Sequence, residues 1–144
     1  IELYLTHNQL KEIEVKLNEG VVFANRINYN KNKDNGTVYD AGIDVFLHRQ
    51  GHYYEYEYSQ FVLGQCHFDY WLPYRQMKAG NKVFLLKDQV AFHQEHPQRY
   101  DHKSWEKTGR HFAILEGMNA QNIPSLSQSI FNHIYKNVIP WTFL

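Results

Sequence analysis

Asp44, Glu55 and Glu57 are the residues whose types and spacing most clearly suggest chemistry in this chain. Asp44 lies in a segment of alternating apolar and polar residues, 43–48, and the two glutamates lie in a second such segment, 53–58. Alternation at a period of two is typical of strands, and the glycine between the segments suits a hairpin turn. Carboxylates on two adjacent strands can hold Mg²⁺ or Mn²⁺, and such an ion lowers the pKa of bound water.

The register of this hairpin follows from burial. If His48 faces Tyr53, one face of the pair carries only apolar and aromatic side chains: Ile43, Val45, Leu47, Tyr54, Tyr56 and Tyr58. We expect that face to be buried, because a slip of one residue would place glutamates in it. The other face sets Asp44 directly across from Glu57, and like charges at that position destabilise a strand pair. A metal ion, a basic side chain or a basic partner would compensate; alternatively, solvent screens the repulsion on an outer face.

This hairpin resembles the core of the PD-(D/E)xK nuclease superfamily, in which an aspartate on one strand is followed across a turn by an acid-x-lysine on the next. Asp44, Glu55 and Glu57 stand at the matching positions, with Glu57 where the family usually has lysine. The resemblance covers this one hairpin. It implies a metal-dependent phosphodiesterase, a nuclease, that acts on nucleic acid with Mg²⁺ or Mn²⁺ bound by these three carboxylates.

The longest polar stretch of the chain, HQEHPQRYDHKSWEKTGR, offers a second set of candidates. Its first histidine, His93, is our candidate acid–base catalyst, and His96 could act in the same way or as a metal ligand. Arg99 and Lys103 could contact phosphates, as could Arg26 from an earlier strand. The alternative interpretation is a hydrophilic loop of mixed charge.

Two other functions remain open from the sequence. The spacings Gly42-x5-His48 and Glu57-x6-Gly64 resemble two pieces of the first cupin motif, although His48 and His52 are four residues apart where that family has two. This resemblance implies a metal-binding enzyme with His48, His52 and Glu57 among the ligands. The chain could instead be a non-enzymatic binding module, such as an immunity, inhibitor or accessory protein, that presents a Tyr-rich sheet face to a protein partner.

The elements before the hairpin must position its acidic face. Thr6 and Gln9 predict a capping box at the start of a helix over 8–18, and Gly20 suits the position after its end. Residues 21–29 alternate as a strand and should pair antiparallel with the strand that begins at residue 37. In the register that aligns the apolar faces, Phe23 meets Ile43 and Arg26 meets Asp40. Arg26 then lies on the acidic face.

The elements after the hairpin complete the expected fold. We expect a strand over 61–72 ended by Pro73, a hairpin of 83–86 with 90–92, a loop over 93–110 and a last strand over 111–115. A helix over 125–138 should begin at Pro124-Ser125 and bury a stripe of apolar residues at helical spacing. The prediction is an α+β fold with a mainly antiparallel sheet, flanked by an N-terminal and a C-terminal helix.

Composition sets the remaining limits. The chain has 144 residues, 43% hydrophobic and 21% charged, which suits one globular domain, 1–144. The 15 basic and 15 acidic residues balance, so the chain lacks the overall positive charge typical of nucleic-acid binders, although a local basic patch is compatible with this balance. Cys66 is the only cysteine, which favours a reducing, cytoplasmic location. No apolar run is long enough to span a membrane, so no membrane partner is expected.

Overall fold

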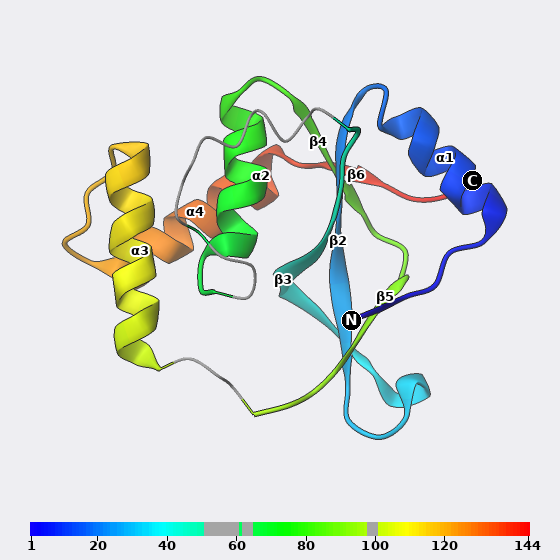
Figure 1. Ribbon diagram of the computed structural model, residues 1–144, viewed down its shortest axis with the longest axis horizontal. Coiled ribbons are helices and arrows are strands. Elements are labelled where there is room, and N and C mark those ends of the chain that lie inside the picture. The colour runs from blue at the N-terminus through cyan, green and yellow to red at the C-terminus, as the bar shows by residue number, and fades with distance from the viewer. Residues whose placement is uncertain (51–60, 62–64, 98–100) are drawn as a thin grey trace.

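The computed structural model describes residues 1–50, 61, 65–97 and 101–144 (Figure 1). The helices are α1 (His7–Lys16), α2 (Phe68–Lys78), α3 (His102–Glu116) and α4 (Ile123–Asn137), with a short 3-10 helix, η1 (Lys33–Asn35). The strands are β1 (Glu2–Leu3), β2 (Gly20–Tyr29), β3 (Thr37–Leu47), β4 (Lys82–Leu86), β5 (Ala91–Gln94) and β6 (Ile139–Trp141). The expected α+β class is confirmed. Among the described residues, no helix is both long and apolar enough to cross a bilayer.

The sheet is mixed rather than mainly antiparallel. β3 pairs antiparallel with one edge of β2, while β4 and β5 both run parallel to β2 along its other edge. β6 pairs parallel with β4, and β1 pairs antiparallel with β5. The expected hairpin of 83–86 with 90–92 is therefore wrong, because β4 and β5 follow one another along β2. Parallel pairing requires a crossover between strands, and α2 lies in the connection from β3 to β4.

The α2 helix corrects the largest sequence-based error. Residues 61–72 were expected to form a strand that Pro73 ends, but residues from Phe68 onward are helical and Pro73 lies inside the helix. A short apolar run fits a buried strand and a buried helix equally well, so its pattern does not distinguish between the two structures. Proline has no N–H to donate to the carbonyl four residues earlier, so the carbonyl of Asp69 lacks its helical hydrogen bond.

The two terminal helices agree better with expectation. The Thr6–Gln9 capping box is present at the start of α1, and α4 buries Leu126, Ile130 and Ile134. Asn122 caps α4 through its side-chain oxygen, which accepts from the Ser125 N–H. The segments expected as a loop over 93–110 and a strand over 111–115 contain the end of β5 and all of α3 except its last residue, Glu116, and α3 begins after its cap Asp101.

Gly20 is the first residue of β2 rather than the end of α1. A Cβ at Gly20 would lie 2.2 Å from the carbonyl oxygen of Lys82, its partner on β4. Glycine is required here because two parallel backbones approach closely, not because a helix ends.

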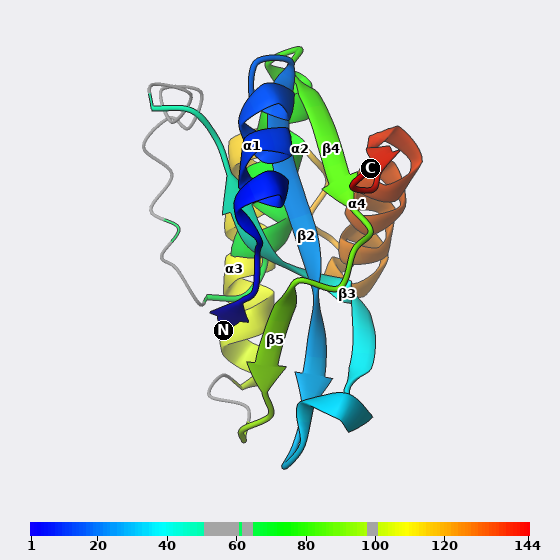
Figure 2. The same cartoon turned by 90° about the vertical axis from the view of Figure 1, so that its right-hand side faces the viewer.

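β2 is buried on both faces of the sheet. Val21 and Phe23 pack with α2, α3 and α4, whereas Val22 and Ala24 pack in a second cluster that Leu17 borders. Figures 1 and 2 show the corresponding layers, with α2, α3 and α4 on one side of the sheet and α1 on the other. Strands covered on both faces lose the simple alternation of a half-exposed strand.

His67 joins the three helices of the larger layer. It precedes α2 with a left-handed backbone (φ 65°) and is only 3% exposed. Its Nδ1 lies 3.1 Å from Thr108 Oγ1 on α3, and its Nε2 lies 2.7 Å from Ser127 Oγ on α4. Burial lowers the pKa of His67 to about 4, so the ring is neutral in the folded protein near pH 7.

Candidate functional site

Two irregularities in β3 create the site. Arg26 of β2 pairs with Tyr39, the preceding Asn25 pairs with Ile43, and Ala24 pairs with Val45, so residues 40–42 and Asp44 are extra residues in β3. Such β-bulges bend a strand and re-aim its side chains. In a regular strand, Asp44 would lie about 17 Å along from Tyr39. The bulges shorten this path and bring Asp44 to Arg26.

These bulges also correct the expected register. Arg26 faces Tyr39 instead of Asp40, and Phe23 faces Phe46 instead of Ile43. Because Asp44 is an extra residue, the alternation changes phase there. Ile43 packs with the helices α2–α4, whereas Val45 packs in the cluster on the other side of the sheet. Ile43 and Val45 are both buried, as expected, but they do not share one face.

Asn25 and Tyr135 hold the first bulge in place. The Asn25 side-chain nitrogen lies 2.9 Å from the carbonyl oxygen of Gly42, 3.2 Å from that of Asp40 and 2.8 Å from the Tyr135 hydroxyl. Tyr135, on α4, donates its own hydrogen bond to the Asp40 carbonyl. A Cβ on Gly42 would lie 2.7 Å from the Tyr39 ring and 3.0 Å from Asp44 Oδ2, so the bulge leaves no room for a side chain there.

Arg26 is held by groups from both strands. Its Nη1 donates to both carboxylate oxygens of Asp44, at 2.8 and 2.9 Å, and its Nε donates to Asn28 Oδ1 at 2.8 Å. The Tyr39 ring packs 4.5 Å from the guanidinium carbon. Charge-assisted hydrogen bonds of this kind fix the orientation of a half-buried arginine. The negative charge of Asp44 was expected to be compensated by a metal ion, a basic side chain or a basic partner. Among the described residues, the basic side chain of Arg26 does so.

His93 is connected to Arg26 through one oxygen. Asn28 Oδ1, which accepts from Arg26, lies 3.3 Å from His93 Nδ1, and Asn28 and His93 are direct partners across β2 and β5. Since this oxygen only accepts, His93 Nδ1 carries the proton and Nε2 keeps its lone pair. Burial, and then the charge of Arg26, lower the pKa of His93 below its ordinary value. The imidazole is therefore neutral near pH 7.

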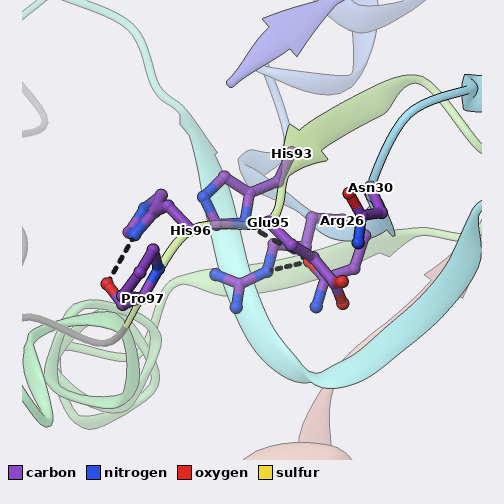
Figure 3. A pocket seen from close by; sticks show the side chains of 7 residues that line it. Arg26, Asn30, His93, Glu95, His96 and Pro97 are labelled. Carbon is purple, nitrogen blue, oxygen red and sulfur yellow. Dashed lines mark hydrogen bonds between the residues drawn. The ribbon is translucent and has the colours of Figure 1, made fainter.

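An open pocket of about 410 Å³ lies over these residues (Figure 3). Its size suits a small molecule or a portion of a larger substrate. The pocket is lined by the end of β2, the end of β5 and the residues that follow them: Arg26, Asn28, Asn30, His93, Glu95, His96 and Pro97.

A second carboxyl group lies within electrostatic reach of Arg26 and Asp44. Asp69 is in the first turn of α2, where its Oδ1 accepts from the Tyr70 backbone N–H at 3.2 Å. Burial, reinforced by the negative charge of Asp44, raises the pKa of Asp69 to about 7. Both forms of this carboxyl are thus populated near neutral pH.

Three of the predicted site residues come together: Asp44, Arg26 and His93. Glu55, Glu57 and Arg99 lie outside the described residues, and so do His52, Gly64 and the tyrosines of the expected Tyr-rich face. Lys103 is exposed in the first turn of α3 and does not line the pocket. The cupin-like ligand set and the Tyr-rich interface therefore stay predictions.

The sequence-based reasoning missed Asn28, Asp69 and Tyr135. Asn28 could have been found from its place two residues after Arg26 on the same face of a strand. Asp69 and Tyr135 gave no such signal, because their positions depend on α2 and on the bulge.

The described residues do not by themselves form a Mg²⁺ site. Both oxygens of Asp44 already accept from Arg26. Within the described ranges, no group of three or more His, Cys, Asp or Glu side chains is placed to hold a metal ion. The expected metal site rests on Glu55 and Glu57 as further ligands, and it stays a prediction.

Comparison with protein-family models, with characterised proteins and with solved structures finds no match to this chain.

Proposed function

We propose that the protein hydrolyses phosphodiester bonds of nucleic acid at this pocket. In this proposal Arg26 binds the phosphate, and His93 accepts a proton from the water that attacks phosphorus. The P–O bond to the leaving oxygen breaks, and that oxygen takes up a proton from solvent water. The observation that carries it is the hydrogen-bonded chain Asp44–Arg26–Asn28–His93, which presents a fixed cation and a neutral imidazole to one pocket. Three of its four members, Asp44, Arg26 and His93, were chosen from the sequence as candidate site residues.

His93 has the properties of a general base. Asn28 holds its Nδ1–H, so the ring keeps one tautomer and the Nε2 lone pair remains available. Its lowered pKa keeps that lone pair unprotonated near pH 7. A positioned base of this kind contributes a factor of about 100 to 10,000 to a hydrolysis rate.

Arg26 has the properties of a phosphate-binding group. Asp44, Asn28 and the Tyr39 ring hold three sides of the guanidinium, while its Nη2 has no hydrogen-bond partner among the described residues. A donor that is already oriented stabilises negative charge in a transition state without further reorganisation. Asp44 acts in this proposal by positioning Arg26.

The metal requirement implied by the nuclease resemblance is a separate hypothesis. Mg²⁺ or Mn²⁺ bound by Asp44, Glu55 and Glu57 would polarise the phosphate. Assays in EDTA, in MgCl₂ and in MnCl₂ separate the two cases. Activity that persists in EDTA argues for hydrolysis by His93 and Arg26 alone.

The first prediction tests the proposed residues directly. Labelled DNA and RNA oligonucleotides are incubated with wild type, His93→Gln, Arg26→Lys and the control His133→Gln, whose histidine is exposed on α4 and does not line the pocket. His93→Gln should lower kcat by about 100- to 10,000-fold, because the base is lost. Arg26→Lys should lower it by about 100- to 1,000-fold, because lysine cannot reproduce the guanidinium geometry.

His133→Gln should retain wild-type activity, and circular dichroism should show that all four proteins are folded. A folded wild type that cleaves no oligonucleotide with or without metal overturns the proposal. Equal activity of His93→Gln and wild type would exclude His93 as the base.

A further inference from the structure

We propose that His93 and His96 form a binding site for a borderline divalent cation, such as Zn²⁺ or Ni²⁺, through their Nε2 atoms. This site differs from the expected Mg²⁺ site in its ligands. It uses imidazole nitrogens in the pocket, not the carboxylates of the hairpin. Imidazole suits Zn²⁺, Ni²⁺ and Cu²⁺, whereas Mg²⁺ prefers oxygen ligands.

The hydrogen bonds of both rings leave the same atom free. The His93 Nδ1–H donates to Asn28 Oδ1, whose identity as an acceptor is established by Arg26. His96 Nδ1 lies 3.0 Å from the carbonyl oxygen of Pro97, which can only accept, so this nitrogen also carries the proton. In both residues Nε2 therefore keeps a lone pair.

This pattern is the one that metal-binding histidines require around them. A ligating imidazole typically donates its other ring N–H to a carbonyl, carboxylate or amide oxygen, which fixes the tautomer and the ring orientation. His93 and His96 each have such a partner from a different part of the pocket wall. The tautomer and the orientation of both rings are thus supported before any ion binds.

The two rings are also close enough to act together. Their centroids are 5.1 Å apart, with the ring planes nearly perpendicular at 89°. Both side chains line the pocket, and Figure 3 shows them as neighbours at its wall. They are separated by only two residues at the end of β5, so the backbone keeps them together.

Glu95 places a negative charge in the pocket that the two imidazoles line. Asp44 balances the charge of Arg26, and Glu95 adds a carboxylate that has no hydrogen bond or ion pair within the described part of the chain. Glu95 lines the same pocket as His93 and His96. Two imidazoles provide the ligands in this conformation, and water completes the coordination as in other open metal sites.

Binding of the ion has a consequence for hydrolysis, which rests on the proposed function. The ion would take the Nε2 lone pair that His93 uses to accept a proton. Zn²⁺ should therefore inhibit hydrolysis at the concentrations at which it binds. Metal binding itself does not depend on the proposed function.

The experiment is calorimetric titration of the full chain with ZnCl₂, with MgCl₂ as the chemical control. Wild type and His133→Gln should bind one Zn²⁺ saturably at micromolar concentration. His93→Gln and His96→Gln should each weaken binding by at least about tenfold. Asn28→Ala should weaken it by about 10- to 100-fold, because the second ring nitrogen of His93 loses its partner.

Two results would overturn the site: no saturable Zn²⁺ binding to the folded wild type, or equal affinity in wild type and both histidine variants. Thermal unfolding of each variant shows whether it is folded. In a folded variant, a loss of Zn²⁺ binding is then due to the loss of the replaced side chain. Zn²⁺ binding by a protein that cleaves no oligonucleotide removes the proposed function and leaves the site. Cleavage without Zn²⁺ binding does the reverse.

Discussion

Arg26 shows how much of this site depends on single side chains. Asp44 on the neighbouring strand β3 accepts from the guanidinium through both carboxylate oxygens, and Asn28 on β2 itself accepts through Oδ1. The sequence suggested that Asp44 suffers from like charges and needs compensation. The cation that provides it is 18 residues earlier in the chain. Removing the carboxylate charge should therefore cost stability, because it leaves a half-buried cation with weaker partners.

Replacement of Asp44 by asparagine tests this pairing. We expect the free energy of unfolding to fall by about 1.5–3 kcal/mol, the usual range for hydrogen bonds to a charged group. Urea denaturation at neutral pH measures the change, and the control is Asp34→Asn, at an exposed position in η1. An unchanged or higher stability would indicate that repulsion among carboxylates, and not the Arg26 pair, dominates at Asp44.

At the scale of elements, α4 positions β3. Tyr135 reaches from the helix to the bulge and is the only side chain of α4, among those described, that hydrogen-bonds to β3. The bulge in turn sets the positions of Tyr39 and Asp44 around Arg26. A change in α4 should thus reach the pocket through the bulge, although α4 does not line it.

Tyr135→Phe separates this positioning role from simple stability. It removes one of the two side-chain donors to the Asp40 carbonyl, and the hydroxyl that accepts from Asn25, and should lower stability by about 1–2 kcal/mol. The matched control is Ile130→Val, which is fully buried in the same helix and should cost about 0.5–1.5 kcal/mol. Tyr135→Phe should lower kcat at least tenfold, and Ile130→Val should not. Equal activity in the two variants would contradict the positioning role.

The same elements show what the sequence could and could not predict. α1 and α4 were expected because capping residues and helical spacing are local signals. α2 was mistaken for a strand because its apolar residues fit both structures, and that error removed the crossover that makes the sheet mixed. Asp44, Arg26 and His93 were chosen for their chemistry and do come together. Their geometry could not be predicted, because the bulge depends on a contact between Asn25 and Tyr135, 110 residues apart.

For the whole molecule, β2 is the element that every layer shares. Its residues contribute to both hydrophobic clusters, it pairs with three other strands, and its last residues form part of the pocket. The core and the candidate site are therefore continuous along one strand. Residues from Val21 to Ala24 pack in the two hydrophobic clusters, and Arg26 and Asn28 line the pocket.

His67 and Asp69, two residues apart, have a joint consequence for the way unfolding exchanges protons with solvent. Asp69, with a folded pKa of about 7 against 3.8, keeps its proton in the folded state, so its contribution to stability falls as pH rises from about 4 to 7. His67, with a folded pKa of about 4 against 6.5, stays neutral, so its contribution falls as pH decreases from about 6.5 to 4. Over this shared interval unfolding moves one proton from the aspartate to the histidine, and the pair neither takes up nor releases any.

Single substitutions should reveal the hidden exchange. Between pH 4.5 and 6, Asp69→Asn should make the slope of unfolding free energy against pH more positive than that of wild type by about 1.4 kcal/mol per pH unit. His67→Gln should make it more negative by about the same amount. Urea denaturation across this range measures both slopes. If the unfolding free energies of both variants change with pH in parallel with wild type, the pKa values of the two groups are not shifted in the folded protein. The contributions of His67 and Asp69 to the pH dependence of the unfolding free energy are thus opposite in sign and cancel in the wild type. A protein that lost either group would have a stability that depends on pH in this range.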